Sequence, residues 1–208
     1  MKRVKSLFKS HSTWASSVRV GASWNLAMEF SVQGVTPNGQ RFVKGQTTRG
    51  ITEDPTIPPA PVRVLAVASG GGHWHELLRL RPALEGCEQY FVGLNKEYAV
   101  SVAPHPFYSV PDAHFDEPFR IICTFFRLIP IFWKIRPHVV LSTGAAPGGL
   151  SMLLGRIFRA RTLWVESAAN CVVQSRTGRL CKHIAGISFV QWPELARSEG
   201  PFYRGNIL

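Results

Sequence analysis

The stretch that most constrains the fold is Val62–Leu84, in which an apolar run meets a cluster of glycines and then a helical pattern. Val62–Ala68 consists of β-branched and other apolar residues, which is typical of a strand buried on both faces. The Ser-Gly-Gly-Gly sequence at 69–72 interrupts this run, and apolar residues recur at helical spacing from His73 onward. The sequence therefore predicts a buried strand, a tight turn and a helix.

A glycine-rich turn that opens a helix is suited to binding an anion. Its backbone N–H groups converge on one spot, which the helix dipole makes mildly positive, and glycine lets an anion approach closely. The pattern matches neither the dinucleotide-binding fingerprint nor a P-loop, so it predicts a phosphate or carboxylate site without naming the ligand. A tight turn that binds nothing is the alternative. The residues of the predicted site are Ser69, Gly70, Gly71 and Gly72.

Composition indicates a globular protein with acidic partners. The chain has 208 residues, 45% of them hydrophobic and 18% charged, which is enough to bury a core. A formal net charge of +11 favours phosphorylated substrates, anionic lipid or nucleic acid. No nucleic-acid-binding motif occurs, so we expect no nucleic-acid partner. The four cysteines and seven histidines lack metal-ligand spacing, so we expect no metal site and interpret the cysteines as core residues in a reducing cytoplasm.

The composition of the chain changes near residue 61. Residues 1–61 carry eight Lys/Arg and three Asp/Glu, contain a possible hairpin turn at 36–39, and end in a proline-rich stretch. We interpret 1–61 as a basic, weakly structured extension and 62–208 as the folded domain. No apolar run of about 18 residues occurs, so no membrane-spanning helix is expected.

From residue 62 onward, short strand patterns alternate with helical ones. This alternation predicts the α/β class, with a doubly wound parallel sheet in which ligands bind at the carboxyl ends of the strands. A loop over 143–149 and a helix over 150–158 should follow the fourth strand. The expected strands are 62–68, 89–93, 106–110, 139–142, 161–165 and 186–190.

Phe119–Arg136 is unusual because it is both very apolar and basic. Pro130 should kink or divide the helix that this pattern predicts. The segment is too short and too basic to span a bilayer, and more apolar than a helix needs to cover one sheet face. Two interpretations remain, a helix in the membrane interface and a core helix between the sheet and a partner. The residues expected at the membrane are Arg120, Phe125, Phe126, Arg127, Phe132 and Trp133.

Five motifs, taken in order, resemble one family of glycosyltransferase subunits. The chain is similar to the acceptor-side, membrane-associated subunit of two-part UDP-sugar glycosyltransferases, and especially to the PssD-type bacterial subunits of exopolysaccharide assembly. The eukaryotic member of this family helps to add the second N-acetylglucosamine to dolichol-linked oligosaccharide. The resemblance covers 62–208 and leaves out 1–61, where the spanning helix of the eukaryotic member has no counterpart. The motifs are SGGGHW at 69–74, STGAAPG at 142–148, WVESAAN at 164–170, SRTGRL at 175–180 and FVQWPEL at 189–195.

The resemblance implies the Rossmann-like amino-terminal half of a GT-B glycosyltransferase, as in MurG. That half binds a polyprenyl-diphosphate-linked saccharide, and in this family a separate partner subunit holds the UDP-sugar donor. We therefore expect no tightly bound cofactor, a peripheral position on the cytoplasmic face of the membrane, and no turnover without the partner. Only residues 191–208 follow the sixth expected strand, which is too little for a second Rossmann-like lobe.

The reaction implied by the resemblance is an inverting transfer from a UDP-sugar to a hydroxyl of the lipid-linked acceptor. It needs a base for that hydroxyl and stabilisation of the departing diphosphate. His73 is a candidate base or phosphate donor, because imidazole exchanges a proton readily near neutral pH. Glu166 is the other candidate base, or an acceptor for a sugar hydroxyl. Either residue could instead be structural, His73 as a cap of the turn and Glu166 as the partner of an arginine.

Two further groups of residues carry expected contacts. A second acceptor loop is expected to involve Thr143, Gly144 and Gly148. Contacts with the acceptor or the partner subunit are expected from Asn170, Ser175, Arg179, Gln191 and Trp192. The rival interpretations are a stand-alone phosphosugar- or nucleotide-binding module without transferase activity, and a complete small transferase that forms a homodimer.

Overall fold

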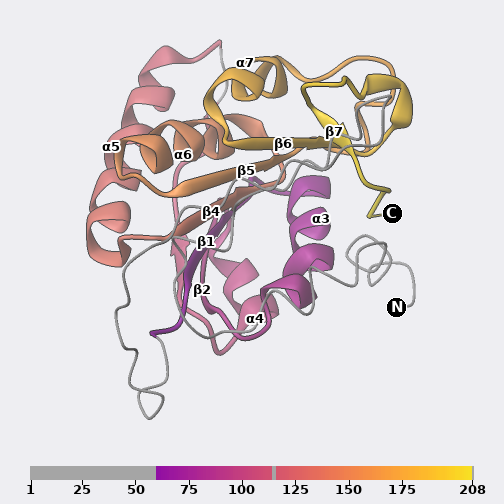
Figure 1. Ribbon diagram of the computed structural model, residues 1–208. Coiled ribbons are helices and arrows are strands. Elements are labelled where there is room, and N and C mark those ends of the chain that lie inside the picture. The colour runs from indigo at the N-terminus through magenta and orange to yellow at the C-terminus, as the bar shows by residue number, and fades with distance from the viewer. Residues whose placement is uncertain (1–59, 114–115, 208) are drawn as a thin grey trace, which may run out of the picture.

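A seven-stranded, wholly parallel β-sheet organises the chain (Figure 1). The computed structural model describes residues 60–113 and 116–207, so the extension predicted at 1–61 lies almost entirely outside the described residues. The order across the sheet is β3-β2-β1-β4-β5-β6-β7, which confirms the doubly wound α/β fold. The strands are β1 (Arg63–Val67), β2 (Glu88–Gly93), β3 (Phe107–Ser109), β4 (Val139–Ser142), β5 (Arg161–Val165), β6 (Ile187–Val190) and β7 (Phe202–Tyr203).

Helices cover both faces of the sheet (Figure 1). One face carries α5, α6 and α7, and the other carries α3 and α4. The α-helices are α3 (Gly72–Leu80), α4 (Ala99–Val102), α5 (Pro118–Ile135), α6 (Ala145–Ile157) and α7 (Arg176–Ile184). The short 3-10 helices are η1 (Arg81–Leu84), η2 (Lys96–Tyr98) and η3 (Pro193–Leu195).

The two apolar cores lie on opposite sides of β1, because successive side chains of a strand point to opposite faces. Leu65 and Val67 join the core under α5, α6 and α7, whereas Ala66 and Ala68 join the core under α3. Each large apolar side chain that is fully buried contributes roughly 1.5–3 kcal/mol. The near-continuous apolar run of β1 is therefore explained by burial on both faces.

The strand order places a topological switch point between β1 and β4. From β1 the chain continues to β2 and β3 on one side, and from β4 it continues to β5, β6 and β7 on the other. Helices α3 and α6, which follow β1 and β4, therefore leave toward opposite faces. A crevice forms at such a point, outside the carboxyl ends of the two strands.

Helix α6 begins earlier than predicted. The expected loop over 143–149 is wrong beyond Gly144, because α6 starts at Ala145 and includes Gly148. Pro147 is tolerated because it stands in the first turn, where its missing N–H would have no partner within the helix. Gly148 is buried and packs on Ser142 and Trp164, so it is a helical packing residue and not part of a polar loop.

Helix α5 is continuous through Pro130, so of the two expected effects, a kink or a division, the division does not occur. Pro130 lies on the exposed side of the helix, where water can reach the carbonyl group of Phe126 that it leaves without a helical partner. The two-residue strand β7 was not predicted, because it is too short to show a periodic pattern. Among the described residues, no helix is long and apolar enough to cross a membrane.

The cysteines do not share one environment. Cys181 is buried, Cys87 and Cys123 are half-buried, and Cys171 is exposed, so the prediction of four core cysteines is wrong for Cys171. Burial, together with the nearby Glu166 carboxylate, raises the pKa of the Cys181 thiol to about 12. Burial also raises the pKa of Cys87. Both thiols are therefore held in the protonated, unreactive form.

Candidate functional site

The predicted glycine turn and the start of α6 meet at one pocket. This pocket has a volume of about 450 Å³ and lies at the switch point between β1 and β4. Small-molecule sites commonly fall in the range of about 300–1,000 Å³. Residues from three helix starts contribute to its wall, and these are Ser69, Gly70 and His73 at α3, Ala145 and Ala146 at α6, and Thr177 at α7.

The turn between β1 and α3 is open to an anion. Gly71 caps the helix with φ 57°, no side chain among the described residues bonds the first-turn N–H groups, and no acidic residue occurs in that turn. A methyl group added at Gly71 or Gly72 would meet nothing within 4 Å, so the space above the turn is free of described residues. The N–H of Gly71 donates to the hydroxyl of Tyr98 at 3.2 Å, and sequence reasoning missed this contact.

The turn between β4 and α6 shows the same lack of a cap but a different backbone. Gly144 has φ 146° and the following Ala145 has φ 63°, a value that residues with a side chain rarely adopt. Helix α6 has no side-chain cap and no acidic residue in its first turn. Two helix N-termini with positive partial charge therefore face the same pocket. Strained backbone of this kind tends to occur at functional sites.

His73 links the two turns. Its Nδ1 lies 3.0 Å from the carbonyl oxygen of Thr143, and the Thr143 hydroxyl donates to the His73 carbonyl oxygen at 2.7 Å. A carbonyl oxygen only accepts, so in the neutral imidazole Nδ1 carries the proton and Nε2 has the lone pair. The side chain of His73 is 29% exposed and lines the pocket. The structure thus brings together His73 and Thr143, which the sequence placed at different turns.

Glu76 is the polar residue of the site that sequence reasoning missed. It is only 7% exposed, and its Oε1 accepts hydrogen bonds from the Ser167 hydroxyl at 3.0 Å and the Ala168 N–H at 2.8 Å. Its Oε2 has no hydrogen-bond partner among the described residues and lies 3.9 Å from Nδ1 of His73. The spacing of three residues between His73 and Glu76 would have indicated that both lie on one side of the helix.

Glu166 lies away from the pocket wall and is almost completely buried, with 1% of its surface exposed. Its Oε1 accepts hydrogen bonds from Asn170 Nδ2 at 2.6 Å and from the Ser175 N–H at 3.1 Å, and its Oε2 accepts one from Trp164 Nε1 at 3.1 Å. A methyl group added at Gly178 would come within 1.7 Å of Oε2. The carboxylate therefore holds the segment between β5 and α7, and it has no arginine partner among the described residues.

The remaining residues predicted to contact the acceptor or the partner divide into two groups. Asn170 and Ser175 surround Glu166, and the Ser175 hydroxyl also caps α7, whereas Arg179 is exposed on α7. Gln191 is 2% exposed and bonds Glu166 and Ile207 through both ends of its amide, so its side chain does not reach a surface, contrary to the prediction.

Trp192 is neither enclosed like Gln191 nor exposed like Arg179. It is half-buried, and its Nε1 donates to the carbonyl oxygen of Ala168 at 2.7 Å. The indole therefore fastens η3 to the loop after β5, close to the oxygen network of Glu76 and Gln191.

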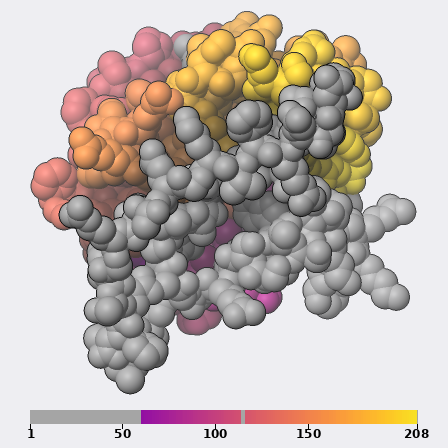
Figure 2. Space-filling view, in the orientation of Figure 1, coloured from indigo at the N-terminus to yellow at the C-terminus, as the bar shows by residue number. Residues whose placement is uncertain are grey.

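Helix α5 presents two different surfaces. Phe132 is fully buried and packs on Phe158, so the prediction that it contacts a membrane is wrong. Phe125 is half-buried against the same core. Figure 2 shows α5 and α6 at the surface on the side opposite the C-terminal residues. The large apolar side chains that α5 exposes are Phe119, Ile122, Phe126 and Trp133, and its basic side chains Arg120, Arg127 and Lys134 are also exposed.

Comparison with known sequences gives a distant relative. No family model matches the chain. The UDP-N-acetylglucosamine transferase subunit ALG14 of Rattus norvegicus is 25% identical over 175 residues, which are 68% of this chain and 80% of that protein. The ALG14 subunit of Mus musculus is also 25% identical, over 171 residues that are 66% of this chain and 79% of that protein.

Comparison with solved structures identifies the fold. MurG of Acinetobacter baumannii superposes with a TM-score of 0.58 at 17% identity, over 70% of this chain and 46% of MurG. UDP-GlcNAc 2-epimerase of Methanocaldococcus jannaschii superposes with a TM-score of 0.51 at 12% identity, over 62% of this chain and 39% of the epimerase. The chain thus spans less than half of either structure. It has the Rossmann-like fold of GT-B proteins and is a distant sequence relative of the glycosyltransferase subunit ALG14.

Proposed function

We propose that this chain is the acceptor-binding subunit of a two-part glycosyltransferase. The acceptor is a polyprenyl-diphosphate-linked saccharide, and a partner subunit holds the UDP-sugar, so this chain itself carries no tightly bound cofactor. The observation that supports this best is the pocket at which two uncapped helix N-termini and His73 converge. Such a site suits a diphosphate next to a hydroxyl that must lose a proton.

The similarity to ALG14 supports the same assignment. ALG14 is a subunit of a UDP-N-acetylglucosamine transferase, so UDP-N-acetylglucosamine is the first donor to test. The chain superposes on 46% of MurG, and the proposal assigns the donor-binding lobe to the partner subunit. The proposed role is that of the PssD-type bacterial subunits of exopolysaccharide assembly.

The transfer step assigned to this site uses His73 as the base. The acceptor oxygen attacks C1 of the sugar from the face opposite UDP, the C1–O bond to UDP breaks, and the hydroxyl proton passes to Nε2 of His73. The hydrogen bond from Nδ1 to the Thr143 carbonyl orients the ring for this role. The free N–H groups at the starts of α3 and α6 bind the acceptor diphosphate. Departing UDP is stabilised by the partner subunit.

Glu76 and Glu166 act as positioning residues in this proposal. Glu76 joins α3 to the loop after β5, so it fixes the helix start that carries His73. Glu166 fixes the loop between β5 and α7, and its oxygens are already occupied by three donors. A base needs a free lone pair within reach of the substrate hydroxyl, so His73 is the better candidate.

Helix α5 provides the contact with the membrane. Its exposed aromatic and aliphatic side chains lie beside exposed arginines, which suits an anionic lipid surface such as the cytoplasmic face of a bacterial membrane. A variant with Phe119, Phe126 and Trp133 changed to Ser should lose flotation with phosphatidylglycerol vesicles. The matched control is Val100→Ser, because Val100 is 85% exposed but lies on α4. Unchanged flotation of the triple variant would contradict this assignment.

Reconstitution tests the proposed function directly. The purified chain is assayed with UDP-N-acetylglucosamine and a polyprenyl-diphosphate-linked saccharide, with and without the protein encoded next to it. We expect transfer only with both proteins present. Robust turnover by this chain alone would reject a two-part enzyme. Binding of the lipid-linked saccharide without transfer, for any UDP-sugar and neighbour, would favour a stand-alone phosphosugar-binding module.

A further inference from the structure

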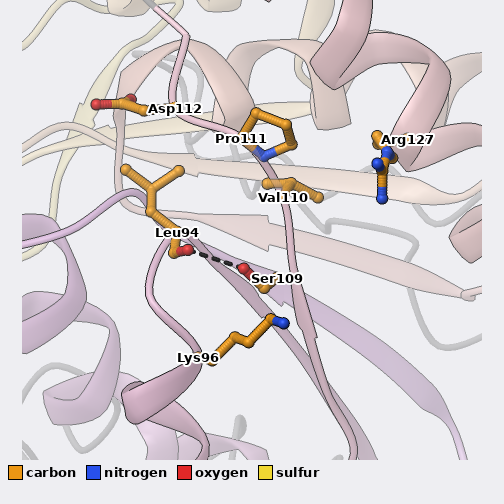
Figure 3. A pocket seen from close by; sticks show the side chains of 7 residues that line it. All are labelled: Leu94, Lys96, Ser109, Val110, Pro111, Asp112 and Arg127. Atoms are coloured by element: carbon orange, nitrogen blue, oxygen red, sulfur yellow. Dashed lines mark hydrogen bonds between the residues drawn. The ribbon is translucent and has the colours of Figure 1, made fainter.

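A second pocket opens beside the first, at the carboxyl ends of β2 and β3 (Figure 3). Its volume is about 400 Å³, and its wall includes the basic side chains of Lys96 and Arg127 together with Ser109. Leu94 and Asp112 line both pockets, so the two are neighbours. The residues of the two glycine turns do not line this second pocket.

The two basic side chains of the second pocket are available to a ligand. Neither the Lys96 ammonium nor the Arg127 guanidinium has a hydrogen-bond or ion-pair partner among residues 60–113 and 116–207. The neighbouring cations of α5 are engaged, since Arg120 pairs with Glu117 at 2.9 Å and Lys134 lies 5.7 Å from the ring centre of Tyr108. Lys96 and Arg127 are therefore the basic groups free to meet an anion here.

The acidic residue of the second pocket does not neutralise these cations. Asp112 accepts the N–H of Ala113 at 2.8 Å, and Figure 3 shows its carboxylate pointing away from Lys96 and Arg127. The floor is fixed as well, because the Ser109 hydroxyl donates to the Leu94 carbonyl oxygen at 2.8 Å and ties the ends of β2 and β3 together. The two strand ends that line the pocket are thus held to each other.

The position of Arg127 on α5 connects this pocket to the apolar surface of that helix. Arg120, Arg127 and Lys134 follow one another at seven-residue spacing, so they form one row along the helix. The exposed apolar side chains lie in the next row around the helix, and Phe126 directly precedes Arg127. A ligand that binds Arg127 through a phosphate can therefore lay an apolar chain along α5.

We infer that Lys96 and Arg127 form a phosphate subsite for the lipid end of a prenyl diphosphate. The lipid-side phosphate of the diphosphate binds these two cations, and its sugar-side phosphate binds the N–H groups at the starts of α3 and α6. The isoprenoid chain runs along α5. The subsite rests on the proposed function, which supplies the diphosphate ligand. A headgroup phosphate of a bilayer lipid would offer similar chemistry. Unlike the proposed acceptor, it is not followed by a second phosphate and a saccharide that would occupy the adjoining pocket with His73.

Binding of a soluble prenyl diphosphate tests the subsite without catalysis. The full chain is titrated with farnesyl diphosphate, and with farnesol and inorganic pyrophosphate as partial ligands, by calorimetry. We expect Lys96→Ala and Arg127→Ala each to weaken farnesyl diphosphate by about 10–100-fold, because each removes a charge-assisted contact. Lys182→Ala is the control of equal charge, since Lys182 is exposed on α7, and it should bind like the wild type.

The outcomes separate the subsite from the other possibilities. Equal affinity of wild type and both variants for farnesyl diphosphate would overturn the inference, as would no binding by the wild type. Loss confined to flotation with phosphatidylglycerol vesicles would also overturn it and assign the cations to bilayer headgroups. Selective loss of farnesyl diphosphate binding in the two variants supports the subsite. If reconstitution with the neighbouring protein then gives no transfer, the proposed function fails but the subsite does not.

Discussion

The two strand-to-helix turns at the switch point have similar sequences but opposite surroundings. The turn after β1 has exposed glycines, and additional atoms at Gly71 or Gly72 would meet empty space. The turn after β4 is buried, and an additional atom at Gly144 would collide with His73. Glycine thus serves access in the first turn and close packing in the second.

This difference assigns separate tasks to the two turns. The open turn presents N–H groups and the imidazole of His73 to a ligand. The closed turn holds that imidazole in place through the Thr143 carbonyl oxygen, and the start of α6 that follows it offers its N–H groups to the same pocket. Changes in the open turn should therefore reduce function at constant stability, whereas changes in the closed turn should reduce stability first.

The largest effect is expected from the open turn, in the reconstituted pair. His73→Ala removes the proposed base and should lower kcat by about 10²–10⁴-fold with little change in the melting temperature. His75→Ala is the matched control, because His75 is exposed on the same helix and does not line the pocket. A loss below about tenfold for His73→Ala would remove it as the base.

The second largest effect is expected in the free energy of unfolding, measured by urea denaturation, when one glycine of each turn is changed to alanine. Gly144→Ala places a methyl group 2.3 Å from Nδ1 of His73 at a φ of 146°, so unfolding should become easier by about 2–4 kcal/mol. Gly72→Ala meets nothing within 4 Å and should change stability by less than about 0.5 kcal/mol. Equal losses for the two variants would contradict the division into an open and a closed turn.

A smaller loss of stability is expected when Glu76, whose carboxylate joins α3 to the loop after β5, is changed. Glu76→Ala leaves the buried N–H of Ala168 and the Ser167 hydroxyl without their acceptor, at a cost of about 1–3 kcal/mol in unfolding free energy. Glu76→Gln keeps an acceptor oxygen and should recover part of that loss. If both variants were as stable as the wild type, Glu76 would not hold α3 to the loop after β5.

The smallest effect concerns the far ends of the same two strands, where His138 precedes β4. Burial and the adjacent Arg63 lower the pKa of His138 from its ordinary value of 6.5. The imidazole of His138 therefore binds a proton more readily in the unfolded chain than in the folded one. The folded state keeps its full stability above pH 6.5 and loses part of it as the pH falls below that value.

Urea midpoints between pH 7.5 and 5.5 measure the effect of His138. His138→Asn keeps an acceptor for the Arg63 N–H, which lies 3.1 Å from Nδ1, but does not titrate. Its midpoint should fall less than that of the wild type over this range. Parallel pH profiles for the two proteins would contradict a contribution from His138.

Much of the sheet was predictable because its strands are continuous apolar runs separated by turn residues. The expected positions of all six predicted strands, β1 to β6, agree with the structure to within one residue at each end. Helix boundaries were less predictable, since the Ala-Ala-Pro-Gly sequence at the start of α6 contains two residues that usually indicate a loop. Only packing on Ser142 and Trp164 shows that Gly148 belongs to the helix.

The sequence also did not show which side of α5 is buried and which is exposed. Sequence predicted aromatic residues at a membrane but could not distinguish Phe132, which is fully buried, from Phe126, which is 65% exposed. The helix is apolar on more than one side, so its pattern does not indicate which side faces the sheet.

The sequence by itself determined the parallel α/β architecture, the glycine turn after β1 and the basic, apolar character of α5. These features are local, because hydrophobic periodicity and glycine placement act within a few residues. Only the tertiary structure decided that His73 meets Thr143, that Glu76 supports the site and that Glu166 is enclosed by its own loop. The contacts of His73 and Glu76 join residues 70 and 92 positions apart, and they depend on strand order that no short stretch of sequence contains. The contacts of Glu166 lie within one segment, but they depend on side-chain packing that its residue pattern does not show.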